Sequence, residues 1–237
     1  MAVAKIVLAL DSSILTTNSS DTLVLSRKVN NTFSTAFATG SIKPRDASTP
    51  QLFSHNVFAW EESFRVLASY NHSSSSALSA SLTNAVDIEH GEVAKYDRNM
   101  LLPAVKIEDF DSGGEIADAA RKSIMFGVTD IPRECKVEVL QSVGSQKCTR
   151  IFQSAEIVMQ RVIEVEISAT FIMFWTGRNL APGGVVPEQH HRGFEMTFED
   201  DQQVVFVRFG YMVPDQPKAA ESPDWYPMGP GSAGFPL

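Results

Sequence analysis

Two adjacent histidines in the C-terminal half are the side chains best suited to chemistry. His190 and His191 are flanked by Glu188 and Arg192, in a loop that contains proline and glycine. An imidazole beside a carboxylate suits acid–base catalysis or metal binding. Either use needs partners from elsewhere in the chain, because neighbouring residues of a strand point to opposite faces. A small enzyme that uses His190 or His191 is therefore one hypothesis, and a solvated loop accounts for the same residues.

A second segment partly matches a calcium-binding loop. Asp109, Asp111 and Glu115 carry the oxygen ligands that hard cations prefer, but the later ligand positions of such a loop are missing. The spacing of Ser112 and Glu115 also fits a capping box at the start of a helix. We therefore expect no metal and no cofactor. The pattern instead predicts a short helix that ends near Phe126-Gly127.

Four large aromatic residues are candidates for ligand contact. Trp60 and Trp175 end alternating strands, which predicts positions in the core or at its rim. If they cap the sheet beside its loops instead, their rings could stack on a sugar face or an apolar ligand. Trp225 and Tyr226 lie in the C-terminal tail, where they could anchor on a membrane, a ligand or a partner.

A period of two in hydrophobicity predicts the elements that position these residues. From Ile163 to Trp175 every odd position is apolar, while Glu164, Glu166, Ser168 and Thr170 are polar; this is the pattern of a strand with one buried face. Similar alternation predicts further strands, at residues 5–10, 22–26, 57–60, 64–70, 86–89, 136–139, 194–198 and 205–211. The last two read as a hairpin joined by a short acidic turn.

The fold class expected from this pattern is mainly all-β. We predict one antiparallel sandwich, jelly-roll-like, over residues 1–213, with one or two short helices. Half of the 12 prolines lie in residues 214–237, so this tail is not expected to pair within a sheet. It is predicted either to be loosely draped or to be an extended arm that docks its aromatic residues on the body or on a neighbouring subunit.

Composition excludes several classes of partner. The chain has 237 residues and a formal net charge of −8, without a cluster of lysine and arginine, which argues against nucleic-acid binding. No stretch has the length of a membrane span, and no convincing signal peptide begins the chain, so a cytoplasmic location is expected, with non-classical export left open. Cys135 and Cys148 fit no zinc pattern; free thiols are the preferred interpretation, and a disulfide is the alternative.

Two segments carry a resemblance to known sequences. Val57-Phe58-Ala59-Trp60 followed by Phe64-Arg65-Val66, and Val165 to Trp175-Thr176-Gly177, resemble uncharacterised fungal β-rich proteins of similar length. Those proteins carry a similar Phe-x-Trp segment and a late strand that ends in Trp or Phe. The resemblance covers about half of the chain, rests on packing motifs and implies no activity.

These observations favour a non-enzymatic recognition protein that binds carbohydrate or another surface ligand through its sandwich loops. The Gly-x-Ser-x-Gly and Ser-x-x-Lys motifs of nucleophilic catalysis are absent from the sequence. The ligand of such a protein could also be a small molecule. Three alternatives stay open: a membrane-active protein of the cytolysin kind, a shell or capsid-type subunit that forms homo-oligomers through its C-terminal arm, and a small enzyme that uses His190 or His191.

Overall fold

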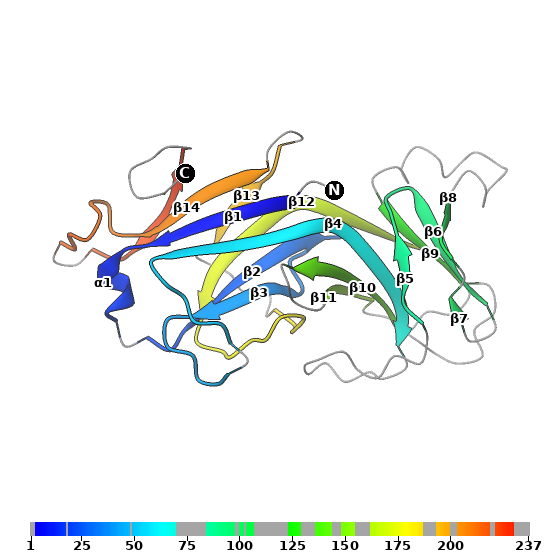
Figure 1. Ribbon diagram of the computed structural model, residues 1–237, viewed down its shortest axis with the longest axis horizontal. Helices are drawn as coiled ribbons and strands as arrows, with labels where there is room; N and C mark the ends of the chain where they lie inside the picture. Colours follow the sequence, from blue (N-terminus) through cyan, green and yellow to red (C-terminus); the bar gives the residue numbers. More distant parts are fainter. Residues whose placement is uncertain are drawn as a thin grey trace.

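The computed structural model consists almost entirely of strands (Figure 1). It describes residues 3–17, 19–47, 49–69, 84–97, 100–101, 103–106, 123–128, 136–143, 148–154, 162–186, 193–199, 203–218 and 221–229. Among these residues the single helix is α1 (Ser12–Leu15). No helix of the described chain has the length and hydrophobicity needed to cross a membrane.

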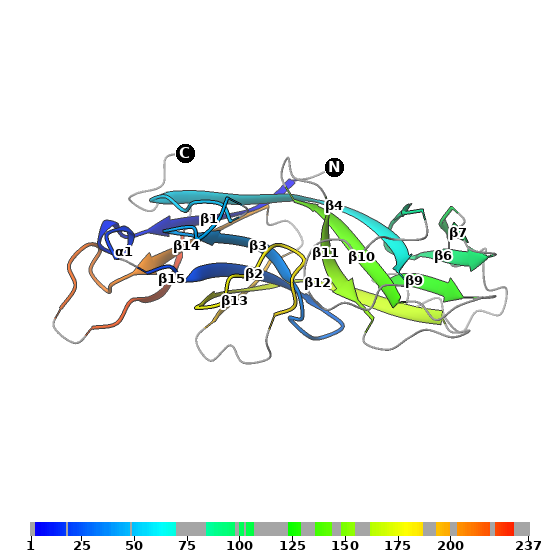
Figure 2. The ribbon, with the colours of Figure 1, turned by 90° about the horizontal axis from the view of Figure 1, so that it is seen from below.

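The expected all-β sandwich is confirmed, because two sheets lie one over the other (Figures 1 and 2). The first sheet has the order β11-β10-β4-β1-β14-β15, with β5 also paired to β4. Its strands are β1 (Val3–Leu10), β4 (His55–Ser69), β5 (Val86–Ile88), β10 (Lys136–Val143), β11 (Thr149–Gln153), β14 (Val204–Gly210) and β15 (Asp224–Met228).

The second sheet has the order β3-β2-β12-β9-β6-β7, with β13 paired to β12 and β8 paired to β6. Its strands are β2 (Thr22–Val29), β3 (Ala36–Ser41), β6 (Glu92–Asp97), β7 (Met100–Leu101), β8 (Val105–Lys106), β9 (Ser123–Val128), β12 (Val162–Thr176) and β13 (Phe194–Thr197). Most pairs are antiparallel, but β1–β14 and β6–β9 are parallel.

Two long strands connect the ends of the molecule. β4 and β12 each have 15 residues and run along most of its length (Figure 1). The first half of β4 pairs with β1, whereas its second half pairs with β10 and β5. β12 pairs with β9 at its start and with β2 and β13 further along. The sequence predicted two separate strands at 57–60 and 64–70, where the structure has the single strand β4.

The alternation predicted for residues 163–175 largely holds. Val165, Phe171 and Met173 are buried, and the core between the sheets forms around such residues. Ala169 is exposed instead, because the ladder between β12 and β2 shifts register between Ile167 and Phe171. Ile172, on the opposite face of β12, is also buried in a second small apolar cluster.

Two local predictions are wrong. Residues 123–128 form β9, so the helix expected to reach Phe126-Gly127 does not extend through them; the start of that prediction lies outside the described residues. The tail was expected to stay out of the sheets, yet Asp224–Met228 forms β15 and pairs with β14. β15 is an edge strand, and one side of it faces solvent. The N–H that Pro227 lacks would point to that side, so the proline removes no hydrogen bond between β15 and β14.

A buried arginine ties the two sheets together. Arg27 of β2 is 4% exposed and donates to both carboxylate oxygens of Glu62 at 3.1 and 3.0 Å and to Gln141 Oε1 at 2.8 Å. Trp60 Nε1 donates to the same carboxylate, at 2.9 Å from Oε1. Burial lowers the pKa of Arg27, while the charge of Glu62 opposes that shift. The guanidinium therefore depends on Glu62 for charge compensation.

Replacing Glu62 by Ala should destabilise the fold. The substitution leaves the Arg27 charge buried without its carboxylate and removes the acceptor of the Trp60 indole, a loss of about 2–4 kcal/mol given that Glu62 itself is partly exposed. Urea unfolding measures this loss. The matched control is Asp87→Ala, which breaks the exposed ion pair with Arg65 and should cost less than about 1 kcal/mol. Equal effects of the two substitutions would contradict the role given to Glu62.

Candidate functional site

Several residues predicted from the sequence lie outside the described parts of the chain. These are His190, His191 and Glu188 of the histidine cluster and Asp109, Asp111 and Glu115 of the acidic segment. Cys135 also lies outside, whereas Cys148 is described as a half-buried free thiol, 3.6 Å from the Ser142 hydroxyl. Within the described ranges, no three His, Cys, Asp or Glu side chains gather in a way that could hold a metal ion.

Trp60 lies in the core and is 1% exposed. Its ring packs against Phe37, Phe171 and Phe198, at centroid distances of 5.5, 4.6 and 5.4 Å. A ligand at the surface cannot reach a ring enclosed in this way. Of the two uses considered for Trp60, the structure therefore shows the core position.

Trp175 and Trp225 are brought together by the structure. Phe209 of β14 lies between them, with its centroid 5.5 Å from Trp175 and 4.6 Å from Trp225, and Phe194 of β13 stacks on Trp225 at 6.2 Å. All four rings are partly buried. Their contacts join β15 to both sheets of the same chain, so Trp225 anchors the C-terminal strand on its own body.

Tyr226 belongs to a different contact. Its ring lies 4.4 Å from the guanidinium carbon of Arg208, which in turn donates to both carboxylate oxygens of Asp11 at 2.9 Å. Asp11 also accepts the backbone N–H of Tyr211 at 2.9 Å. The four predicted aromatic residues therefore serve three separate packing roles and do not form one ligand surface.

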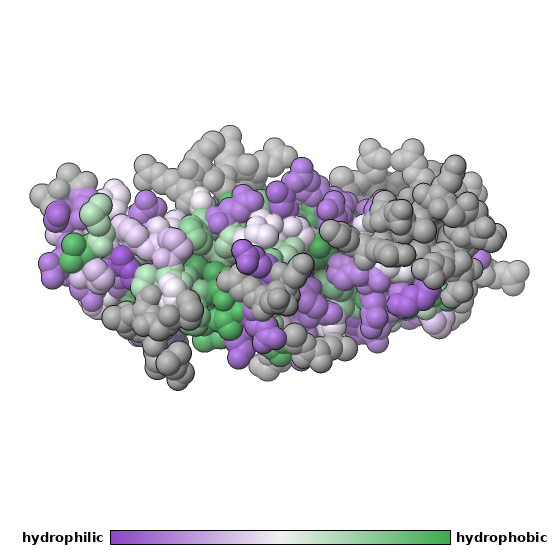
Figure 3. All heavy atoms as spheres, turned by 90° about the horizontal axis from the view of Figure 1, so that it is seen from above, coloured by the Kyte–Doolittle hydropathy of each residue, from purple (hydrophilic) through white to green (hydrophobic). Residues whose placement is uncertain are grey.

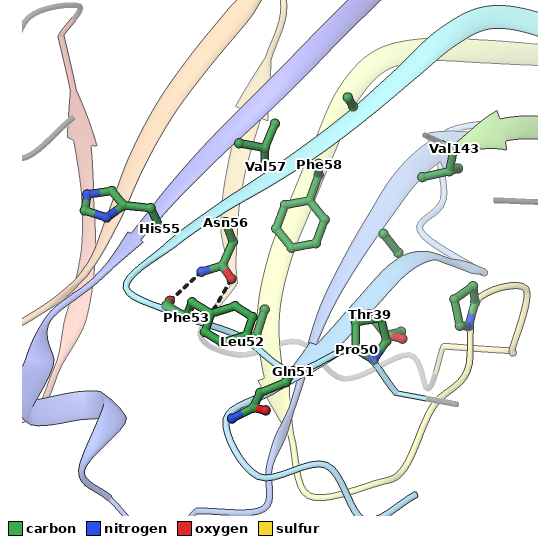
Figure 4. Close-up of a pocket in the computed structure, with 13 residues that line it drawn as sticks. Thr39, Pro50, Gln51, Leu52, Phe53, His55, Asn56, Val57, Phe58 and Val143 are labelled. Atoms are coloured by element: carbon green, nitrogen blue, oxygen red, sulfur yellow. Dashed lines mark hydrogen bonds between the residues drawn. The ribbon is translucent and has the colours of Figure 1, made fainter. Parts of the chain in front are cut away.

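A groove of 370 Å³ opens between the two sheets instead, between β3 and the first half of β4. Its apolar lining includes the buried or half-buried Leu52 and Phe58 and the exposed Phe53 and Val57, which are 62% and 61% exposed. Figure 4 shows Val57 and Phe58 on opposite sides of β4. In the space-filling view of the molecule from above, hydrophobic residues also reach the surface near the middle (Figure 3).

The groove has little charge. Its polar lining consists of Thr39, Gln51, His55 and Asn56, and His55 is the one titratable side chain among the residues that line it. Thr39 is 3% exposed, and its Oγ1 has no hydrogen-bond partner in the described structure. The surface therefore offers apolar contact and neutral hydrogen-bonding groups.

The edge of β4 that faces the groove is unpaired over a short length. Leu10 N donates to Ser54 O at 2.8 Å, and bonds alternate along an antiparallel ladder, so the even residues of this half of β4 bond to β1. The backbone groups of Val57 and Ala59 must then point the other way. On that side, β10 pairs with β4 only as far as Trp60, and no described strand continues the ladder to Val57.

Gln141 marks the point where the pairing of β10 with β4 becomes irregular, just before the last pair, Val143 with Trp60. Its Nε2 donates to Glu61 O at 2.9 Å, where the register of β10 and β4 shifts. Glu61 is an odd residue of β4, so its carbonyl confirms the direction derived for Val57 and Ala59. A side chain thus satisfies the Glu61 carbonyl at the irregularity. The last pair, Val143 with Trp60, uses the backbone groups of the odd residues beside Trp60, so Val57 is the odd residue beyond the pairing.

The opposite wall of the groove is an edge as well. β3 pairs with β2 on one side, while Ser41 uses its other side, donating to Pro50 O at 2.9 Å and accepting from Leu52 N at 2.8 Å. Thr39 lies two residues before Ser41 without a register shift, so its backbone groups point to the same side. Two strand edges, one from each sheet, therefore flank the groove.

Asn56 holds the loop at one end of the groove. Phe53 N donates to Asn56 Oδ1 at 2.9 Å, and Asn56 Nδ2 donates to Phe53 O at 2.7 Å (Figure 4). The side-chain amide of Asn56 thus bonds to the backbone of Phe53 as the backbone of a paired strand would. These two bonds keep Phe53 at the rim of the groove. Nothing in the sequence pattern singled out Phe53 or Asn56. The only signal is that an asparagine follows Phe53 by three residues, and such a spacing is too common to predict a contact.

Comparisons with known proteins do not identify the chain: no family model, no curated protein and no solved structure matches it. The groove is therefore the feature from which a function can be inferred. Its distinguishing features are the two strand edges, the exposed apolar rim of Phe53 and Val57, and the neutral lining.

Replacing Gly40 by Ala should disturb one wall of the groove. An added Cβ would lie 2.5 Å from Leu52 Cδ2 and 2.9 Å from Cγ, so Leu52 must move. We expect a loss of about 1–3 kcal/mol in urea unfolding and faster hydrogen exchange at the Leu52 amide. Gly177→Ala is the matched control, since a Cβ added there would lie 3.8 Å from Asp21 Oδ1, which is ordinary van der Waals contact. Unchanged exchange at Leu52 in the Gly40 variant would contradict this account.

Proposed function

We propose that this chain is a non-enzymatic recognition protein and that its ligand binds in the groove between β3 and β4. The observation that carries the proposal is the exposed pair Phe53 and Val57 at the rim of a groove whose walls are held in place by hydrogen bonds. Soluble domains bury most large apolar side chains, and apolar side chains exposed beside a concave surface are typical of binding sites.

The rigidity of the loop supports binding. The bonds of Asn56 to Phe53 and of Ser41 to Pro50 and Leu52 hold residues 50–53 against the two sheets. A preformed wall loses little conformational entropy when a ligand binds, so more of the contact energy appears as affinity. Residues 50–53 belong to the loop between β3 and β4, and ligand binding through such loops is what the sequence predicted for a recognition protein.

The ligand classes proposed from the sequence fit the groove to different extents. The exposed ring of Phe53 could stack on a sugar face, with Gln51, Asn56 and the backbone as hydrogen-bonding partners. Another surface ligand with an apolar side would use Val57 and Leu52 as well. Carbohydrate and other ligands are therefore screened together in the first experiment.

Phe53→Ser and Val57→Ser should weaken binding without unfolding the protein. A glycan array, a small-molecule thermal-shift screen and an array of short synthetic peptides define the ligand. Each substitution should then lower affinity by about tenfold or more, which corresponds to about 1.4 kcal/mol. Both side chains are largely exposed, so the free energy of unfolding should change by less than about 0.5 kcal/mol.

Met212→Ser and Val105→Ser are the matched controls for these substitutions. Met212 is 69% exposed and Val105 is 42% exposed, and neither lines the groove. Both variants should bind like the unmodified protein. A ligand whose affinity responds equally to all four substitutions, or a complete failure of the three screens, would refute the proposal.

A further inference from the structure

We infer that the occupant of this groove is an extended, uncharged polypeptide segment of a partner, which adds as a strand to the open edge of β4 at Val57. The inference rests on the proposed function and specifies its ligand. Strand addition uses the partner's backbone for affinity and its alternate side chains for specificity.

The first support is the direction of the backbone groups. The bonds Leu10 N to Ser54 O and Lys5 N to Gln203 O both require that Val57 and Ala59 point their N–H and C=O groups away from β1. Lys5 lies opposite Ala59 and donates to the β14 side, as the alternation demands. The edge therefore directs backbone N–H and C=O groups into the groove, where an added strand would bond to them.

The second support is the residue type at the open position of β4, while the register shift between β10 and β4 lies on the far side of Trp60. Natural sheets guard their edges with lysine, proline or bulges. The edge of β15 carries Pro227, whereas the open residue of β4 is Val57, which is neither lysine nor proline. The edge at β15 is thus protected by a proline, whereas the edge of β4 at Val57 can still pair with another strand.

The third support is the match in charge. The residues that line the groove include no carboxylate, lysine or arginine, although 20% of the chain is charged. A charged segment would leave its charges in this neutral setting without partners, at a cost in desolvation. A segment of uncharged residues avoids this cost of burying charges, and its backbone supplies the polar groups that the edges need.

The side chains of an added strand would alternate between two environments. One set would point between the sheets, toward Leu52, Phe58 and Val143, and the other would lie beside the exposed Val57. Because successive side chains of a strand point to opposite faces, small or branched apolar residues at every second position suit the inner set.

Val57→Pro tests the backbone contact directly. Proline removes the N–H that points into the groove and no bond of the ladder to β1, so the strand should be kept. Val57→Thr is the matched control, because it keeps the N–H and a branched side chain. The probes are acetylated and amidated peptides in which Val or Ile alternates with Thr or Ser, and fluorescence anisotropy measures their affinity. We expect Val57→Pro to weaken binding by about tenfold or more and Val57→Thr by less than about threefold.

A second measurement leaves the protein unchanged, so it holds even if Val57→Pro fails to fold. The same peptides carry N-methyl groups on alternate residues, in the two possible registers. One register should abolish binding and the other should preserve it, because only every second N–H of an added strand faces β4.

The outcomes separate the inference from the proposed function. Binding of glycans or small molecules, weakened by Phe53→Ser but unaffected by Val57→Pro, would keep the proposed function and overturn strand addition. Peptide binding that tolerates both N-methyl registers would also overturn it. Self-association that Val57→Pro abolishes would identify a second copy of this chain as the occupant, in place of a partner. Failure of every probe to bind would overturn both proposals.

Discussion

The contacts of Gln141 are the constraint on which the rest of the arrangement depends. Its Oε1 accepts from the buried Arg27, and its Nε2 donates to Glu61 O where β10 and β4 lose register. Arg27 in turn donates through Nε to Ser168 O, at the irregular stretch of β12. One connected pair of side chains therefore satisfies backbone groups at both irregularities and fixes the sheets relative to each other.

The groove follows from the same point. Because β10 pairs with β4 only as far as Trp60, the backbone groups of Val57 face the space between the sheets. β3 forms the other wall. The loop that carries Leu52 bonds to the outer edge of β3 at Ser41 and so closes the groove on that side. Leu52 can lie over β3 only where Gly40 has no side chain. A core network and a single glycine thus shape the surface proposed to bind.

Much of the fold could be predicted from the sequence, and less of the site. The alternation around Val165 and Met173 identified a strand with a buried face, and the all-β class followed from such patterns. The helix predicted to end near Phe126-Gly127 failed at β9, because apolar residues at helical spacing in a short segment also fit a strand. The pairing of β15 was missed because prolines argue against a strand, and only its place at an edge makes Pro227 harmless.

By itself the sequence determined the strands that alternate regularly, such as β12 and β14, because local periodicity decides which side chains share a face. It also determined the acidic balance and the lack of a basic surface. The tertiary structure alone decided that Trp60 is enclosed, that Trp225 packs on its own chain, and that Val57 lies at an open edge. The reason is that strand order and the point where a ladder ends depend on contacts between residues far apart in the chain, such as Arg27 with Gln141, which no local pattern contains.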